Sequence, residues 1–164
     1  MEAEKMKLLL ISLISFLSFV AIAGDNNVEI RTKGSSSLIH IDQIGTSNTA
    51  KVWCGLSEGT YPTHNCSNAT IDIDQEGTSN TAKAYSQVAN HTGNEYKIDQ
   101  DGNDNIGYID ADDDGNDMDV VQNGNNNDAE IYMQGDNNVY SITQTGDDKE
   151  GEIRAFGDSS NFSI

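Results

Sequence analysis

Residues 122–154 are QNGNNNDAEIY, MQGDNNVYSIT and QTGDDKEGEIR, three units of equal length that follow one another without a gap. Each unit has glycine in its third place and isoleucine in its tenth. The first place alternates between glutamine (Gln122 and Gln144) and methionine (Met133), so the full period is 22 residues. A fixed period of this length predicts a solenoid, in which each repeat is one turn of the chain that cannot bury its apolar face alone.

The same unit recurs earlier in the chain, as QIGTSNTAKVW from Gln43, as QEGTSNTAKAY from Gln75 and again from Gln100. Gln43 and Gln75 are separated by one full period plus an insertion. Gln75 and Gln100 are separated by slightly more than one period, and the excess lies around residues 90–94. We therefore predict five rungs, led by Gln43, Gln75, Gln100, Gln122 and Gln144.

Apolar and polar residues alternate within each half-rung. In the fourth rung Asn127, Ala129 and Ile131 point to one side, and Asp128 and Glu130 point to the other, which is the period of a half-buried strand. A turn rich in glycine, asparagine and aspartate follows each strand. No stretch of the repeat region keeps apolar residues at helical spacing. The predicted fold class is therefore an all-β, amyloid-like β-solenoid of strand-turn-strand rungs that form two stacked parallel sheets.

Stacking rungs about 4.8 Å apart would place like residues on like residues. Glutamine and asparagine side chains can then hydrogen-bond from rung to rung, and glycine permits the positive φ of a tight turn. Besides the five leading glutamines, we predict as assembly ladder residues Ile41, Asn48, Val52, Ile73, Asn80, Ile98, Asn105, Ile109, Val120, Asn127, Ile131, Ile142, Ile153 and Ile164. The predicted turn residues are Gly45, Gly77, Gly102, Gly124, Gly135, Gly146 and Gly157.

The first 23 residues have the pattern of a secretory signal peptide. Lys5 and Lys7 precede the apolar residues 8–23, a run shorter than the roughly 20 residues of a membrane-spanning helix. The run ends in Ala-Ile-Ala before Gly24, and small residues of this kind are typical of a cleavage site. We therefore predict a signal peptide at residues 1–23, export of the chain and no stable insertion in a membrane.

The exported chain is expected to comprise a short segment at 24–36, with export as its candidate role, and the solenoid at 37–164. A loop inserted at about 53–66 contains the two cysteines of the chain, Cys54 and Cys66. In an oxidising compartment an isolated pair of cysteines favours a disulfide. We therefore predict a disulfide that closes this loop.

The chain is strongly acidic, with a net charge of −18 at pH 7. Nucleic acid is excluded as a partner on this ground, because binding to phosphates requires basic surface. Outward carboxylates such as Asp128 and Glu150 recur once per period, so stacking brings like charges close together. We therefore expect assembly to depend on pH and salt, with Lys51 and Lys83 as a local cationic exception.

Residues 37–50, SLIHIDQIGTSNTA, contain the full motif S-x5-Q-x-G-x-x-N-x-A, and parts of the motif recur in phase in the four later rungs. In this respect the chain resembles the curlin repeat family. The resemblance implies a secreted, non-enzymatic subunit of curli-type functional amyloid, a fibre on the cell surface that serves adhesion and biofilm formation.

The resemblance also implies partners. The first is the chain itself, through the open ends of the solenoid, and the others are a nucleator subunit and an outer-membrane secretion pore. Nucleators of this family typically have a basic last repeat, whereas the last rung here has only Lys149 and Arg154 as basic residues, among Asp147, Asp148, Glu150 and Glu152. The major subunit is therefore favoured, and the nucleator is the alternative within the family.

Two other binding functions have motifs in the chain. Residues 110–115, DADDDG, match the first six places of a calcium-binding EF-hand loop, but place 12 is Val121 instead of glutamate. The threonines of the first two rungs resemble the array of an ice-binding solenoid: Thr46, Thr49, Thr78 and Thr81. A solenoid that binds calcium or ice without polymerising is therefore the alternative outside the family.

The three histidines, His40, His64 and His91, lie at no spacing from serine, cysteine or carboxylate that matches a catalytic motif. His64 lies two residues before Cys66, but a metal site made from the cysteine pair would lack a fourth ligand. We therefore predict no enzyme, no cofactor and no metal site.

Overall fold

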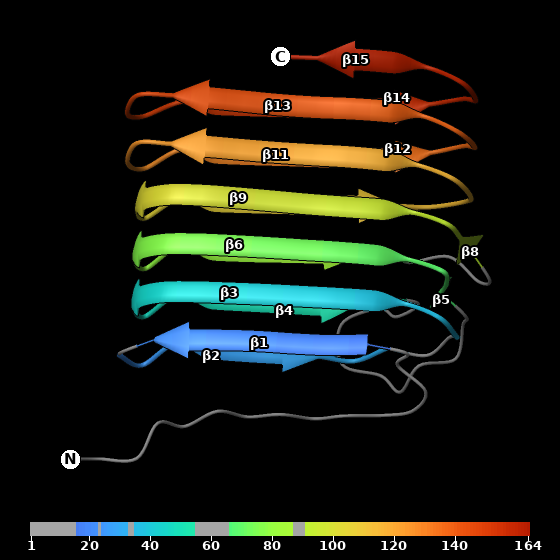
Figure 1. The fold of residues 1–164 in the computed structure, drawn as a ribbon. Helices are drawn as coiled ribbons and strands as arrows, with labels where there is room; N and C mark the ends of the chain where they lie inside the picture. The colour runs from blue at the N-terminus through green and yellow to red at the C-terminus, as the bar shows by residue number, and fades with distance from the viewer. Residues whose placement is uncertain (1–15, 23, 33–34, 55–65, 87–90) are drawn as a thin grey trace.

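The computed structural model describes residues 16–22, 24–32, 35–54, 66–86 and 91–164. Every regular element in these residues is a strand, and the strands stack as the rungs of a β-solenoid (Figure 1). The predicted fold class is therefore confirmed, with parallel sheets and about five turns. No helix long and apolar enough to cross a bilayer occurs among the described residues.

Two parallel sheets face each other, and consecutive long strands of the chain alternate between them. In the described part of the chain, sheet A has seven strands, in the order β1 (Phe16–Ile22), β3 (Leu38–Thr46), β6 (Thr70–Thr78), β9 (Glu95–Asn103), β11 (Asp117–Asn123), β13 (Val139–Thr145) and β15 (Asn161–Ser163). Sheet B has six, in the order β14 (Glu150–Phe156), β12 (Asp128–Gln134), β10 (Ile106–Ala111), β7 (Thr81–Tyr85), β4 (Thr49–Trp53) and β2 (Asn27–Ile30).

The register of both sheets joins equivalent residues of successive rungs. Gln75, for example, pairs with Gln43 on one side and with Gln100 on the other, although these neighbours are 32 and 25 residues away. The irregular spacings are absorbed at one corner, where β5 (Cys66–Ser67) and β8 (His91–Thr92) form a third, two-stranded sheet. The insertions therefore leave the stacking register unchanged.

The solenoid extends beyond the boundary predicted at residue 37. Strand β2 lies in the segment that was expected to be a separate N-terminal region, and it pairs Val28 with Ala50 and Ile30 with Val52. Val28 and Ile30 are buried because the alternation Val-Glu-Ile points their side chains into the space between the sheets. Strand β1, within the predicted signal peptide, pairs along β3 from Leu38 to Ile44.

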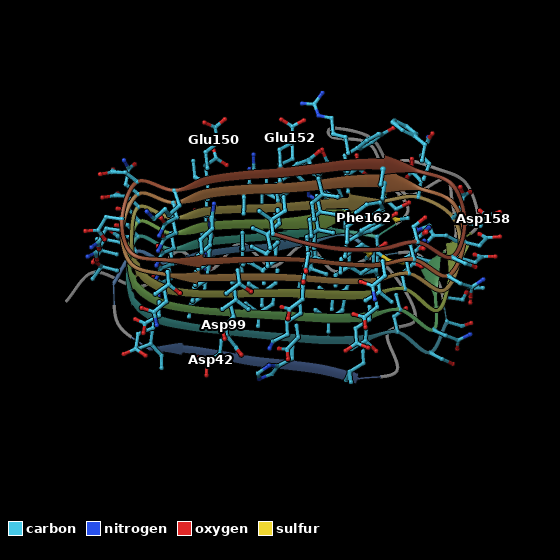
Figure 2. All side chains as sticks on the ribbon, turned by 90° about the horizontal axis from the view of Figure 1, so that it is seen from above. Asp42, Asp99, Glu150, Glu152, Asp158 and Phe162 are labelled. Atoms are coloured by element: carbon cyan, nitrogen blue, oxygen red, sulfur yellow. A yellow bond between two sulfur atoms is a disulfide. The ribbon has the colours of Figure 1, made fainter. Side chains whose placement is uncertain are left out.

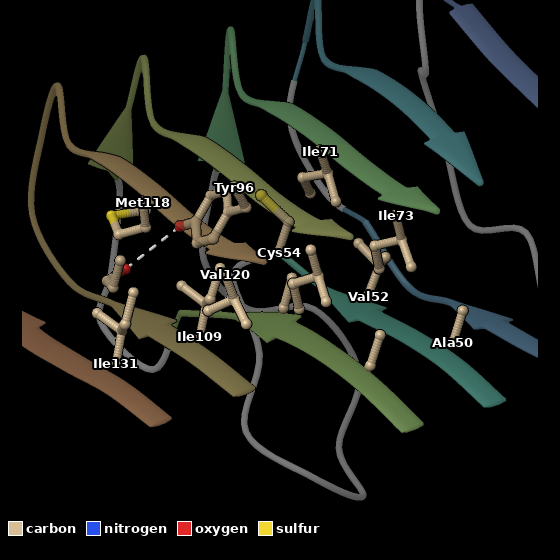
Figure 3. Packing of buried hydrophobic residues seen from close by; sticks show 14 of the residues in the cluster. Ala50, Val52, Cys54, Ile71, Ile73, Tyr96, Ile109, Met118, Val120 and Ile131 are labelled. Atoms are coloured by element: carbon tan, nitrogen blue, oxygen red, sulfur yellow. Dashed lines mark hydrogen bonds between the residues drawn. The ribbon is translucent and has the colours of Figure 1, made fainter. Parts of the chain in front are cut away.

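The core lies between the two sheets, and Figure 3 shows part of it. Its residues extend from Val28 to Ile153, so the core runs the length of the solenoid. Large side chains of sheet A face a column of alanine and glycine in sheet B. A methyl group at Gly107 would stand 2.9 Å from Cγ2 of Ile98 and 3.1 Å from Nε2 of Gln100. Small residues in sheet B therefore make room for the isoleucine and glutamine columns of sheet A, where each buried isoleucine stabilises the fold by roughly 1.5–3 kcal/mol.

Glycine is required at the corner where the chain leaves a strand of sheet A for the next strand of sheet B. Gly102 has a φ of 127°, and a Cβ atom there would collide with the carbonyl oxygen of Gly124 in the next rung. Gly45 and Gly77 meet the glycine above them in the same way. Adjacent corners can approach to the spacing of a β-ladder only because no side chain stands between them.

Candidate assembly surface

The five leading glutamines form one amide ladder inside the solenoid. The Nε2 atom of each donates to the Oε1 atom of the next, at 2.7 Å from Gln43 to Gln75, 2.8 Å at the two middle steps and 2.9 Å from Gln122 to Gln144. The Nε2 atom of Gln75 also donates to the carbonyl oxygen of Thr49 in sheet B at 3.2 Å. The buried amides of the middle rungs are thus satisfied by equivalent rungs on both sides.

The predicted asparagine ladder lies at the corner beside the glutamines. The Oδ1 atom of Asn48 accepts from the backbone N–H of Asn80 at 3.0 Å, and Asn105 and Asn127 continue the pattern at 3.0 and 3.1 Å. The Nδ2 atom of Asn80 donates to the carbonyl oxygen of Gly102 at 2.8 Å. Each asparagine therefore ties its corner to the next rung.

Two parts of the asparagine arrangement were not predicted as ladder residues. Asn26 extends the first ladder downward, since its Oδ1 atom accepts from the N–H of Asn48 at 2.9 Å. A second ladder occupies the opposite corner, where the N–H of Asn116 donates to Asn94 and that of Asn138 to Asn116, both at 2.9 Å. The regular spacing of these residues by one period was the signal that could have identified them.

The predicted apolar ladder is two columns, one in each sheet. Sheet A contributes Ile41, Ile73, Ile98, Val120, Ile142 and Ile164, and sheet B contributes Val52, Ile109, Ile131 and Ile153. All are buried except Ile164, which is 60% exposed at the end of the chain.

The C-terminal end of the solenoid has an uncovered apolar surface. Phe162 stacks on Tyr140 with ring centroids 5.7 Å apart, and its other side is open, so that 57% of the residue is exposed. Figure 2 shows Phe162 between the two sheets when the solenoid is seen from above. A hollow of about 470 Å³ lies beside it, lined in part by Ile153, Ala155 and Ile164. This end presents the interior of the solenoid to solvent.

The predicted turn and disulfide residues lie at the corners. The glycines all have positive φ, Gly45, Gly77, Gly102, Gly124 and Gly146 in one corner column and Gly135 and Gly157 in another. Cys54 and Cys66 are joined by a disulfide with Cα atoms 5.5 Å apart. The loop between them at 55–65, which includes His64, lies outside the described residues.

The outer faces of the sheets are polar and differ from rung to rung. On sheet A, the Nδ1 atom of His40 lies 2.8 Å from Oδ1 of Asp72 and 3.8 Å from Oδ1 of Asp74. The hydrogen bond to Asp72 raises the pKa of His40, and burial together with Asp72 raises the pKa of Asp74. The possible ligand atoms of these three side chains lie close enough together to hold a metal ion, and no other such group occurs among the described residues. His91 lies elsewhere, at the corner in β8.

Of the EF-hand-like residues, Asp110 and Ala111 are the last two of β10, and residues 112–115 form an acidic turn before β11. Asp112 accepts a hydrogen bond from the hydroxyl of Ser86 at 3.2 Å, and Asp114 accepts one from the N–H of Thr92 at 2.6 Å. Asp113 accepts from the N–H of Gly135 at 3.0 Å. These carboxylates therefore take part in hydrogen bonds between rungs.

The threonine array is short. The hydroxyls of Thr46 and Thr78 lie 3.3 Å apart, but Asn103 pairs with Thr78 in the next rung. Likewise Ile106 pairs with Thr81 in the next rung, so both threonine columns end after two rungs.

Fold and ladders together define a parallel β-solenoid with in-register amide and apolar columns. The family model described as curlin associated repeat matches residues 114–146. These residues include the leading glutamines Gln122 and Gln144, and the match supports the resemblance to curlin repeats. No curated protein and no solved structure matches the chain.

Proposed function

We propose that this chain is a secreted structural subunit that polymerises end to end into curli-like amyloid fibres at the cell surface, for adhesion and biofilm matrix. The observation that supports the proposal most strongly is the continuity of the inner ladders from rung to rung. Because each rung stacks on an equivalent rung inside the chain, a rung of a second chain can stack on the end of the first in the same way.

Two structural features favour polymerisation over binding to a different partner. The parallel edge strands at the ends have unpaired N–H and C=O groups, which most proteins cover or protect. The exposed side chains of Phe162 and Ile164 belong to the inner columns, so a further rung of this kind would bury them. We infer a major rather than a nucleating subunit, exported as a signal-peptide precursor through an outer-membrane pore and assisted by a separate nucleator.

A seeded growth assay tests this function. Purified exported protein is incubated with and without sonicated fragments of earlier growth, and thioflavin fluorescence and sedimentable mass are followed. We expect a lag that the fragments abolish, because an existing end replaces the slow first contact. Protein that stays monomeric at all concentrations, with or without fragments, would contradict the proposal and favour the calcium- or ice-binding alternative.

A further inference from the structure

The two ends of the solenoid are stepped. At the C-terminal end, β15 adds a strand to sheet A beyond β13, and no described strand lies on β14 in sheet B. At the N-terminal end, β2 is the last strand of sheet B, and β1 is the strand of sheet A beside β3. Removal of residues 1–23 as a signal peptide would delete β1. The exported chain would then have a half-rung at each end, one in sheet B and the other in sheet A.

We propose that these two half-rungs are the complementary halves of one joint between copies of the chain, and that β1 fills the joint until it is removed. In the joint, β15 of one copy pairs with β3 of the next, in the place of β1. At the same level, β2 of that next copy pairs with β14 of the first. This inference rests on the proposed polymerising function and specifies its partner, its register and its control.

The register of sheet A fixes which residues meet. Leu38 and Val139 belong to one column of successive partners, and Asn161 is the next member after Val139. In the precursor, Phe16 pairs with Leu38. Continuing the register across the joint therefore places Asn161 of one copy on Leu38 of the next.

This register joins apolar surface to apolar surface. Phe162 falls on Ile39, and Ile164 falls on Ile41 of the next copy. Phe162 and Ile164 are 57% and 60% exposed in the single chain, although both occupy inward columns. Their burial in the joint completes the two columns and removes this apolar surface from water, which favours the joint.

Sheet B supplies the second half of the contact. The same register places Val28 of the next copy over Gly151 and Ile30 over Ile153, at the hollow of about 470 Å³. The sequence Glu-Ile-Arg occurs at 29–31, across the end of β2, and at 152–154 in β14. At both places the glutamate and the arginine form an ion pair. The joint therefore brings together glutamates that are already compensated by their own arginines.

The precursor cannot make this joint, because one strand edge pairs with one strand. β1 covers β3 from Leu38 to Ile44, which includes the residues that β15 requires. Cleavage of the signal peptide would thus expose the acceptor edge, and the chain would become competent to polymerise only on export.

A crosslinking experiment on the full chain tests the joint. A recognition sequence for a site-specific protease is placed between residues 23 and 24, so that the same preparation is compared before and after cutting. Leu38→Cys and Asn161→Cys are made in separate chains, which are mixed and treated with a short bismaleimide that leaves the Cys54–Cys66 disulfide intact. Both positions are exposed. The matched control replaces Leu38→Cys with Ile44→Cys, which is equally exposed at 42% but lies roughly 20 Å further along β3.

We expect uncut chains to stay monomeric and uncrosslinked. After cutting, they should form fibres in which the 38–161 pair crosslinks at least tenfold more than the 44–161 pair. A second variant, Ile164→Asp, should retain the circular dichroism of the monomer but slow elongation at least tenfold, whereas Ile106→Asp, on the outer face of β10, should not.

Three outcomes would overturn the inference. Uncut chains that polymerise as fast as cut chains would show that β1 does not block assembly. Fibres of cut chains without the 38–161 crosslink would reject the joint and leave polymerisation standing. Cut chains that form no polymer at all would reject both the joint and the proposed function.

Discussion

The inner columns and the outer faces of this solenoid obey different rules. The glutamine column repeats the same residue in five successive rungs, whereas one column on the outer face of sheet B changes from cationic to aromatic to acidic over the same rungs: Lys51, Lys83, Tyr108, Glu130 and Glu152. The glutamine column is constant because the side-chain oxygen of each buried amide in its middle rungs accepts a hydrogen bond from its counterpart one rung away. The outer residues are solvated, and water can hydrogen-bond to any polar side chain. Stacking is therefore encoded inside, and charge and solubility are encoded outside.

The largest effect is expected at the glycine corner. Gly102→Ala adds a Cβ atom that collides with the backbone of Gly124, at a positive φ that disfavours alanine. We expect a loss of about 4 kcal/mol in the free energy of unfolding, from overpacking and backbone strain together. The matched control is Gly157→Ala, whose Cβ would meet no atom within 4 Å at a similar φ of 126°. Equal urea midpoints for the two variants would show that the close approach of the corners is not what requires glycine.

The second effect tests the amide ladder. Gln100→Leu keeps an apolar side chain in the column but removes the acceptor of Gln75 and the donor to Gln122. Two buried amides lose a partner, and we expect a loss of about 2–3 kcal/mol in the free energy of unfolding. The outward neighbour in the same strand is the control, since Asp101→Asn should change stability by less than about 0.5 kcal/mol. Equal losses in the free energy of unfolding for the two substitutions, measured by chemical denaturation, would show that the amide ladder does not stabilise the fold.

The third prediction concerns the pH dependence of the outer face of sheet A. Burial raises the pKa of Asp74 and of Asp119, and the hydrogen bond to Asp72 raises the pKa of His40. In each case the folded chain binds the proton more tightly than the unfolded chain. These groups therefore stabilise the fold at low pH, and that contribution is lost as pH rises through the raised pKa values.

Urea denaturation between pH 4 and pH 8 measures this contribution. We expect the midpoint to fall as pH rises, and we expect the fall to be smaller in Asp74→Asn, which has no carboxyl to titrate. A wild-type midpoint that rises over this range, or a variant with an unchanged profile, would contradict the assignment.

The smallest effect should come from the stacked carboxylates of sheet B. Asp128 pairs with Glu150, and Figure 2 shows Glu150 and Glu152 pointing outward from their sheet. Added salt shortens the Debye length to about 8 Å or less and weakens their repulsion, so the lag of fibre growth should shorten. Asp128→Asn should shorten the lag at low salt and reduce its dependence on salt. A lag that responds to neither would assign assembly to the inner columns alone.

Much of the interior was predictable from the sequence, because a fixed period decides which residues stack. The positions of the glutamines, of one asparagine ladder and of the isoleucines followed from that period alone. Strand β2 was missed because Val28 and Ile30 give only a short alternation without the glutamine and glycine of the motif. The small sheet of β5 and β8 was missed because two-residue strands have no periodicity to detect.

The outer-face contacts were beyond sequence reasoning for a different reason. The approach of His40 to Asp72 depends on an insertion between them that changes their separation to 32 residues while the register is kept. The prediction that Gln43 and Gln75 lead successive rungs aligns His40 with Asp72, but only the structure shows that Nδ1 of His40 lies 2.8 Å from Oδ1 of Asp72.

X-ray diffraction from aligned fibres of the exported protein tests the central claim most directly. If chains join by stacking rung on rung, strands perpendicular to the fibre axis should give a meridional reflection at about 4.8 Å. The spacing of the two sheets should give an equatorial reflection at about 10 Å. Fibres without that meridional reflection, or a protein that forms no fibres, would contradict the claim.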